Sequence, residues 1–357
     1  MFTLQATYLF AQVGAPATYY SGFNWSLTGM AMKNALATKI TTTHTNILSY
    51  AEAESALKIV DLDPADTTNT NLFLLYGFSQ NICPSSITDD NDHRRRNKNA
   101  DGGGASCEWN REHVYAKSLG TPNLGETGAG ADAHHLRACD VQRNSDRSSS
   151  KFGAGSGNSG YNGSLWYPGD EWKGDVARNM MYLYLRYPTQ CKPTGVGSGA
   201  TVASDASMVN LFLLWNAEDP VSQYESNRNT YLGNSSNTYG QGNRNPFIDN
   251  PYLATVIWGG QVAQNLWPNT FLSSNQFDIL GMVSIFPNPT NGNKVTIQSD
   301  INLDIIELIN INGQVIERIE KPVFENNSFE LNNLQTGFYF VKLSADNQST
   351  TKKLIVN

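Results

Sequence analysis

Apolar positions in the first two thirds of the chain recur at the three- and four-residue spacing of helices. The clearest stretch is 171–187, where apolar residues fall on one face and Pro188 ends the pattern. A second apolar stretch covers 208–215, and residues 28–60 carry a longer helical periodicity. A short apolar run at 72–76 fits a buried strand or helix segment. The pattern predicts a mixed scaffold of helices with a few short strands.

The last part of the chain changes to alternating apolar and polar residues. Turn signals such as Asn312-Gly313 separate the alternating segments at short, regular intervals. The predicted strands are 294–298, 305–309, 314–319, 328–331, 337–343 and 351–356. This pattern predicts a small antiparallel β-sandwich. The whole chain is therefore expected to be α+β, with a mixed helical domain at 12–272 and the sandwich at 273–357.

Composition limits the classes of protein that this chain can be. Its 357 residues are enough for two domains, and 39% hydrophobic residues suffice for a core. Only 16% of the residues are charged, and the net charge is −7. No run of about 18 apolar residues occurs, so no segment is expected to span a membrane. These values exclude an integral membrane protein, a coiled coil and a basic DNA-packaging protein.

Residues 1–11 resemble the second half of a secretory signal peptide. Their apolar stretch ends in Ala11 and is followed by a polar segment, although no basic segment precedes it. We expect a signal-peptide remnant here; the alternative is a short apolar strand. The low charge and the abundance of Asn, Ser, Thr and Gly agree with a secreted or cell-surface protein.

An exported chain also fits an even number of cysteines, which an oxidising compartment would pair. The four are Cys83, Cys107, Cys139 and Cys191. Three pairings are possible, and Cys83 with Cys107 is slightly favoured because it would close off an Arg-rich loop. A zinc site from His134, His135 and Cys139 is the rival interpretation, but the paired Cys-x-x-Cys spacing of structural zinc is missing.

Charge is spread unevenly along the chain. Residues 93–151 carry ten basic and seven acidic side chains, a net charge of +3 in a chain that is acidic overall. A local positive field of this kind suits a polyanionic substrate. For the Arg-rich segment 94–98 taken alone, a solvated basic loop is the alternative.

The segment most indicative of chemistry contains the adjacent pair Glu112 and His113. Neighbouring side chains on a strand point to opposite faces, so at a strand end one can hold a metal while the other faces a water. Downstream, Asn144 precedes Ser-Asp-Arg147 in a sequence suited to opening a helix. Mg²⁺ needs few protein oxygens, which Glu112 and Asn144 could supply. His113 could be the base for phosphodiester hydrolysis, with Arg147 or Arg137 neutralising the phosphate.

These residues lie in motifs that resemble the bacterial endonuclease I family. The motifs, in order over about 27–258, are Asn110-Arg-Glu-His-Val114, Asp132-Ala-His-His-Leu-Arg137, Asn144-Ser-Asp-Arg147, Lys173-Gly-Asp-Val-Ala-Arg178 and Gln241-Gly-Asn-Arg-Asn-Pro-Phe-Ile248. The resemblance implies an active site built as a ββα-metal (His-Me) finger. It also implies a secreted nuclease that cuts DNA, and often RNA, without sequence preference, using Mg²⁺ and leaving 5′-phosphate ends.

The resemblance also carries roles onto individual residues. His113 takes the general-base position, and Glu112 and Asn144 take the metal-ligand positions, where Mn²⁺ or Ca²⁺ could replace Mg²⁺. One departure is Asp249-Asn250-Pro251, which stands where many relatives have a His before the Pro.

The arginine that stabilises the product in relatives has no clear match. Arg147, Arg137 and Arg111 are all candidates; we assign Arg147 to catalysis and the other two to substrate binding. Arg244 either contacts the nucleic-acid backbone or is a buried ion-pair partner, and the sequence favours neither.

The tail resembles the C-terminal sorting domain of type IX secretion cargo. Its matching segments are Phe286-Pro-Asn-Pro289, Asn310-Ile-Asn-Gly-Gln314, Leu334-Gln-Thr-Gly-Phe-Tyr339 and Lys352-Lys-Leu-Ile-Val356. The resemblance implies export across the outer membrane by the type IX machinery. A carbohydrate-binding sandwich is the alternative.

The expected function is that of a secreted, monomeric, metal-dependent endonuclease acting on DNA and RNA. Two alternatives stay open: a nuclease restricted to RNA, and a noncatalytic nucleic-acid-binding protein on the same fold. The second would be indicated by the loss of Glu112, His113 or Asn144, all of which are present.

Overall fold

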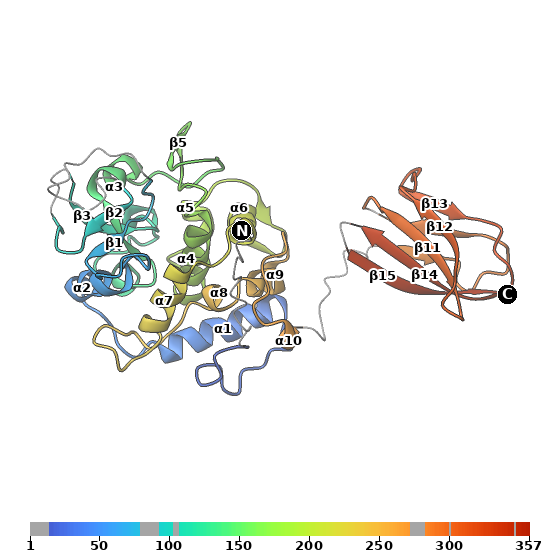
Figure 1. Ribbon diagram of the computed structural model, residues 1–357, viewed down its shortest axis with the longest axis horizontal. Helices are drawn as coiled ribbons and strands as arrows, with labels where there is room; N and C mark the ends of the chain where they lie inside the picture. The colour runs from blue at the N-terminus through green and yellow to red at the C-terminus, as the bar shows by residue number, and fades with distance from the viewer. Residues whose placement is uncertain (1–13, 79–92, 103–106, 272–282, 300, 346–347) are drawn as a thin grey trace, which may run out of the picture. The chain divides into compact units, whose positions relative to one another are not determined.

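The computed structural model describes residues 14–78, 93–102, 107–271, 283–299, 301–345 and 348–357. The chain divides into two compact units, Met1–Phe271 (unit 1) and Leu272–Asn357 (unit 2), each drawn in Figure 1. The expected signal-peptide remnant at 1–11 lies outside the described residues. In the described part of the chain, no helix combines the length and the apolar character that a membrane span needs.

Unit 1 combines helices with short antiparallel strand pairs, which matches the predicted α+β mixture. Its longer helices are α1 (Gly29–Thr43), α2 (Tyr50–Val60), α3 (Val141–Arg147), α4 (Lys173–Arg186), α6 (Asn210–Glu218), α7 (Gln223–Leu232) and α9 (Tyr252–Trp258). Its shorter helices are η1 (Lys117–Leu119), η2 (Gly128–Ala131), α5 (Pro193–Val196), α8 (Pro246–Asp249) and α10 (Pro268–Phe271). Its strands are β1 (Asn71–Phe73), β2 (Arg95–Asn97), β3 (Trp109–His113), β4 (Leu136–Asp140), β5 (Gly160–Asn162), β6 (Leu165–Tyr167), β7 (Thr201–Val202) and β8 (Asp205–Val209).

Helix α4 is the centre of unit 1 and confirms the helix predicted at 171–187. It packs against α1, α6 and α8 (Figure 1). Its side chains are buried on nearly every face. The buried charged side chains on α4 are paired: Arg178 binds Glu225 at 2.6 Å, and Asp175 accepts from Arg137 at 2.8 Å. The apolar residues of α4 pack in the largest core cluster, with Phe152, Trp215 and Trp258.

A smaller core holds β3, β4 and α2 together on one side of unit 1. Leu57 of α2, Trp109 of β3 and Leu136 of β4 are fully buried in it. Strands β3 and β4 pair antiparallel, with His113 opposite Leu136, and α3 packs on both strands. In Figure 1 these elements lie together with β1 and β2, at the left of the unit.

Capping residues fix where the helices beside β3 begin. Helix α2 starts with a capping box, in which Ser49 accepts from the Glu52 N–H and Glu52 accepts from the Ser49 N–H. Helix α3 starts at Asp140, whose carboxylate accepts from the backbone N–H groups of Gln142 and Arg143. The predicted helix opening near Asn144 is therefore wrong by about one turn, and Asn144 lies inside α3.

Unit 2 confirms the strands predicted from the alternating pattern. Its strands are β9 (Ser284–Phe286), β10 (Val295–Gln298), β11 (Ile305–Asn310), β12 (Val315–Glu320), β13 (Ser328–Leu331), β14 (Gly337–Ala345) and β15 (Gln348–Val356). Among the described residues they form a three-stranded sheet, β13-β10-β9, and a four-stranded sheet, β12-β11-β14-β15, all antiparallel. Buried residues such as Ile297, Ile306, Val341 and Leu354 form one core.

Two of the four cysteines are unpaired, contrary to the expectation that all four form disulfides. Cys139 and Cys191 are free thiols, each buried, and the Cys139 thiol lies 3.2 Å from the Leu75 carbonyl. Both side chains are therefore held by packing in the core and not by a disulfide bond. The favoured pairing of Cys83 with Cys107 involves Cys83, which lies outside the described residues.

Candidate active site

Strand β3 ends at the Glu-His pair, and its alternation distributes side chains to two neighbours. Asn110 and Glu112 face α3: Asn110 accepts from Asn144 at 2.7 Å, and Glu112 accepts from Arg147 at 3.0 Å. Arg111 and His113 face Tyr50 at the start of α2 instead. The predicted location of the pair at a strand end is confirmed.

The Arg111 guanidinium lies 3.7 Å from the centre of the Tyr50 ring, and the His113 ring stacks on Tyr50 at 5.7 Å. Arg111 also donates to the Tyr50 carbonyl at 2.6 Å and lies 3.3 Å from Glu54. These contacts with α2 therefore hold the side chains of Arg111 and His113 in place at the end of β3.

The strand end and α3 line a common cavity of about 350 Å³. Four of the predicted residues, Glu112, His113, Asn144 and Arg147, line it, and so does Arg111. The other lining residues come from the turn after β3 and the end of α3: Ala116, Lys117, Ser118, Asn123, Ser148 and Ser149. The side chains of Glu112, His113 and Asn144, which were predicted to act together, thus line the same cavity.

Glu112 is only 2% exposed, and two side chains donate to the same oxygen of its carboxylate. Tyr76 Oη and Arg147 Nη1 each lie 3.0 Å from Glu112 Oε1. Among the described residues, no side chain donates to Oε2. Burial raises the pKa of Glu112 to about 7, although Arg147 and the Tyr76 hydroxyl act in the opposite direction.

His113 is held by its second ring nitrogen. Nε2 lies 3.0 Å from the carbonyl oxygen of Gly130 in η2, and because a carbonyl only accepts, the ring hydrogen sits on Nε2. Nδ1 is then the basic atom of the ring. Burial, with a smaller contribution from His135, lowers the pKa of His113 to about 3, so the imidazole is neutral near pH 7.

The Asn144 amide is oriented by its two donated hydrogen bonds. Nδ2 donates to Asn110 Oδ1 at 2.7 Å and to the Arg111 carbonyl at 3.3 Å. Because both amide hydrogens are used on this side, Oδ1 is the atom left to accept from or bind another group. A carboxylate oxygen and an amide oxygen on one cavity are the hard ligands that Mg²⁺ prefers.

The predicted arginines fall into two groups. Arg111 and Arg147 line the cavity, but Arg147 is fully buried and donates to Glu112 and to the carbonyls of His113 and Val114. Arg147 therefore has its Nη atoms occupied within the fold.

The structure does not bring the other two arginines to this cavity. Arg137 is 1% exposed, pairs with Asp175 at 2.8 Å and donates to the Tyr224 hydroxyl at 3.2 Å. Arg244 pairs with Asp249 through several hydrogen bonds, the shortest 2.6 Å. Of the two interpretations for Arg244, the ion-pair partner is the one that the geometry favours. The expected substrate contacts of Arg137 and Arg244 are not supported by where these side chains lie.

His134 and His135, which the rival zinc interpretation used, are buried side chains whose Nε2 atoms lie against backbone carbonyls. His134 Nε2 lies 2.9 Å from the Asn243 carbonyl, and His135 Nε2 lies 2.6 Å from the Ala129 carbonyl. Across the described residues, no group of three or more His, Cys, Asp or Glu side chains could hold a metal ion. A metal site made of Glu112 and Asn144 contains only one residue of these four types, so the absence of larger groups does not bear on it.

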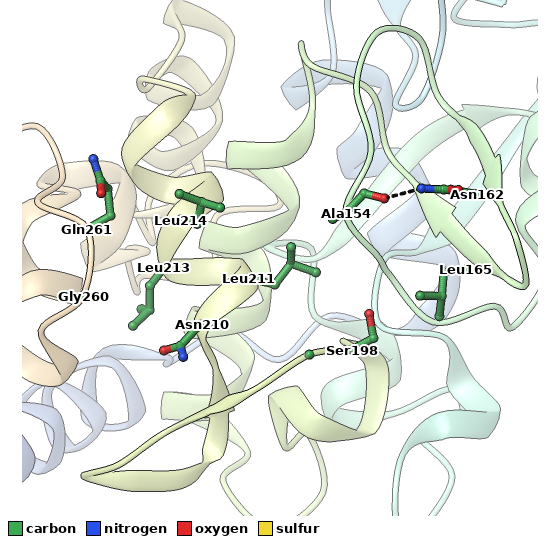
Figure 2. A pocket seen from close by; sticks show the side chains of 11 residues that line it. Ala154, Asn162, Leu165, Ser198, Asn210, Leu211, Leu213, Leu214, Gly260 and Gln261 are labelled. Atoms are coloured by element: carbon green, nitrogen blue, oxygen red, sulfur yellow. Dashed lines mark hydrogen bonds between the residues drawn. The ribbon is translucent and has the colours of Figure 1, made fainter.

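A larger cavity of unit 1 lies elsewhere and offers no comparable chemistry. It measures about 740 Å³ and lies between the β5–β6 hairpin and the start of α6 (Figure 2). Leu165, Leu211, Leu213 and Leu214 line it together with small residues and amides, and no titratable side chain does. Size alone therefore does not locate the active site.

Sequence reasoning missed the residues that orient the predicted ones. Tyr76, Tyr50 and Gly130 contact Glu112 or His113 from segments 36, 63 and 17 positions away in the chain. No local pattern marks the two tyrosines. The Gly-rich run 128–130 was the only available signal for Gly130, because a close backbone approach often needs small residues.

Comparison with known proteins assigns both units. The family model of endonuclease I matches residues 28–252, and that of the secretion system C-terminal sorting domain matches residues 284–357. Extracellular ribonucleases of Bacillus amyloliquefaciens and Bacillus subtilis are 39% and 38% identical over 255 and 254 residues. Each alignment covers 68% of this chain and 78% of the relative.

A much weaker likeness concerns PorZ, a surface component of the type IX secretion system of Porphyromonas gingivalis. It has a TM-score of 0.19 and 18% identity over 24% of this chain and 12% of PorZ, which establishes no shared fold. The two family matches carry the assignment. The chain belongs to the endonuclease I family of nucleases and ends in a type IX sorting domain, which makes it a secreted or cell-surface enzyme.

Proposed function

We propose that this enzyme is a sequence-nonspecific endonuclease that hydrolyses phosphodiester bonds of DNA and RNA with Mg²⁺ and leaves 5′-phosphate ends. The observation that carries the proposal is the common cavity of Glu112, His113 and Asn144. In this proposal β3, β4 and α3 are a ββα-metal finger: strand β3 supplies the carboxylate and the base, and helix α3 supplies the amide.

The residues present fit a divalent cation. Glu112 keeps Oε2 without a side-chain donor within the described part of the chain, and the Asn144 amide directs its hydrogens away from Oδ1. These two oxygens would hold the ion, and water would complete its shell. A bound Mg²⁺ would supply positive charge against the scissile phosphate and its leaving oxygen.

His113 acts as the general base in this proposal. Nε2–H is tied to Gly130, so Nδ1 takes a proton from the water that attacks phosphorus in line with the leaving 3′-oxygen. The lowered pKa keeps the imidazole neutral before reaction. The negative phosphate bound beside it then favours the imidazolium that proton transfer produces.

Arginine roles follow from exposure and pairing. Arg147 is a positioning residue, because its Nη atoms hold Glu112 and the backbone that follows it. Arg111 and Lys117 are the cations at the cavity that contribute to phosphate binding. Such contacts are independent of base identity and weaken with salt, which agrees with cleavage without sequence preference.

Parallel digestion of single-stranded DNA, duplex DNA and RNA, each with Mg²⁺ or with EDTA, tests the activity. All three should be cut with Mg²⁺ and none with EDTA, and the DNA fragments should ligate without prior kinase treatment. His113→Ala should lose cleavage by about 10³-fold with the circular dichroism spectrum unchanged. Wild-type cleavage by His113→Ala would refute the base assignment, and an unchanged Mg²⁺ titration of Asn144→Ala would refute that ligand.

A nuclease restricted to RNA is the second candidate, because both Bacillus relatives are described as extracellular ribonucleases. The same panel separates the candidates, since an RNA-restricted enzyme leaves both forms of DNA intact at enzyme concentrations that digest RNA completely.

A further inference from the structure

Tyr76 lies beneath the candidate active site and takes an unusual backbone conformation. Its side chain is fully buried, its ring packs edge-on against Trp166 at 5.7 Å, and its φ angle is +66°. A left-handed φ is costly for a bulky residue and persists only where the surroundings fix it. Here the Ser159 hydroxyl donates to the Tyr76 carbonyl and helps to fix that conformation.

The hydroxyl of Tyr76 has one partner in the described structure, and that partner is Glu112. The 3.0 Å hydrogen bond ends on Oε1, the same oxygen that accepts from Arg147. With both side-chain donors on one oxygen, the Glu112 carboxylate has a fixed plane, and its other oxygen has no side-chain donor among the described residues and is available to a ligand in the cavity. We propose that Tyr76 is a positioning residue that orients Glu112 so that Oε2 can bind the metal ion. This inference rests on the function proposed above.

The chemistry of the pair explains why a tyrosine suits this position. Packing against Trp166 needs only an aromatic ring, and a phenylalanine would bury that ring without desolvating a hydroxyl. A second arginine could also orient Glu112, but its charge would compete with a cation for the carboxylate. A tyrosine hydroxyl orients the carboxylate and adds no charge. Outer hydrogen bonds of this kind commonly tune metal ligands.

A matched control exists in the same unit. Tyr182 is also fully buried, and its hydroxyl donates to the Asp132 carboxylate at 2.8 Å. Asp132 does not line the cavity. Tyr182→Phe therefore also removes a buried hydroxyl that donates to a buried carboxylate, away from the proposed metal ligands; this hydroxyl accepts from Asn243 as well, so the control loses one hydrogen bond more than Tyr76→Phe does.

Mn²⁺ binding in the absence of nucleic acid tests the inference, with free Mn²⁺ measured by electron paramagnetic resonance. Tyr76→Phe should weaken Mn²⁺ binding by about tenfold or more, whereas Tyr182→Phe should change it less than twofold. In cleavage assays, Tyr76→Phe should raise the half-saturating Mg²⁺ concentration by a similar factor and recover most of its rate at saturating Mg²⁺. Replacement of Tyr76 by 4-aminophenylalanine restores a neutral donor and should restore Mn²⁺ affinity.

Three outcomes separate the possible failures. If Glu112→Gln binds Mn²⁺ as the wild type does, the proposed metal site itself is wrong. If Glu112→Gln loses binding while Tyr76→Phe keeps it, the metal site stands and the role of Tyr76 is refuted. If Tyr76→Phe does not fold, the 4-aminophenylalanine variant decides: wild-type affinity supports the donor role, and weakened affinity in a folded protein overturns it.

Discussion

Two buried carboxylates in the nuclease unit are bonded in opposite ways. Asp132 receives hydrogen bonds on both oxygens, from the His134 N–H and Gln241 on Oδ1 and from the hydroxyls of Tyr182 and Tyr187 on Oδ2. Glu112 receives side-chain donors on Oε1 alone, from Tyr76 and Arg147. The first carboxylate is saturated, and the second has acceptor capacity left.

The two carboxyl groups accordingly differ in acidity. Burial opposes ionisation of both, but for Asp132 the nearby His44 and His134 and the donated hydrogen bonds outweigh it and lower the pKa to about 2. For Glu112 burial dominates and raises the pKa to about 7. A saturated carboxylate stabilises the fold by itself. An undersaturated one gains most when a cation is added, which is the arrangement expected of the proposed metal ligand Glu112.

The largest expected effect separates the two carboxylates by activity. Glu112→Gln should lower kcat/KM by about 10³-fold, because a neutral amide provides little charge to hold a divalent ion against the phosphate. Asp132→Asn should stay within about threefold of the wild type at a temperature where it is folded, because its carboxylate does not line the cavity. Initial rates of plasmid nicking measure both. A loss in Asp132→Asn as deep as that in Glu112→Gln would break the comparison.

The second effect concerns stability on the Glu112 side. Arg147→Met should lower the free energy of unfolding by about 3–5 kcal/mol, because it leaves a buried carboxylate without its ion-pair partner and two carbonyls without their donor. Lys58→Met is the control, since the Lys58–Asp101 pair is about one-third exposed and should cost about 1 kcal/mol or less. Urea unfolding measures both. If Arg147→Met keeps its stability but loses cleavage, the phosphate-neutralising role that the sequence suggested is correct.

Arg147 also illustrates what the sequence could and could not provide. Local patterns located α4, most strands of unit 2 and the strand end with Glu112 and His113, because periodicity and adjacent residues determine such features. The pairing of Arg147 with the carbonyls of His113 and Val114 depends on how α3 folds back on β3, which no local pattern encodes. Motif resemblance placed Arg147 near the chemistry, and only the fold shows that its Nη atoms are occupied.

The predicted start of α3 and the predicted pairing of the cysteines were wrong for related reasons. Asp140 caps α3, so the helix begins at Val141, whereas the sequence favoured a start near Asn144. Two thiols expected to pair are buried separately, because spacing in a sequence does not determine distance in space. Tyr76 carried no signal at all: its contact with Glu112 joins positions 36 apart.

The third effect is acid sensitivity on the Asp132 side. The folded-state pKa of Asp132, about 2, lies below its ordinary value of 3.8, so ionised Asp132 stabilises the fold above about pH 4. This contribution, about 2 kcal/mol, is lost as the pH falls from about 4 to 2. Asp132→Asn should therefore be less stable than the wild type at pH 7 by about that amount, with a smaller difference at pH 3. Urea unfolding at both pH values measures it, and an equal deficit at pH 7 and pH 3 would contradict the lowered pKa.

The smallest effect extends the comparison from carboxylates to cations. Lys117 lines the cavity with its side chain 32% exposed and lies 3.3 Å from Glu126, whereas Arg244 is held by several hydrogen bonds to Asp249. Lys117→Ala should raise KM a few-fold and reduce the slope of log KM against log salt concentration by about 1, because one phosphate contact is lost. Arg244→Ala should lower stability and leave that slope unchanged. If Arg244→Ala instead flattens the slope, Arg244 leaves its ion pair to reach the nucleic-acid backbone, and the division between saturated and available groups does not hold for the cations of this enzyme.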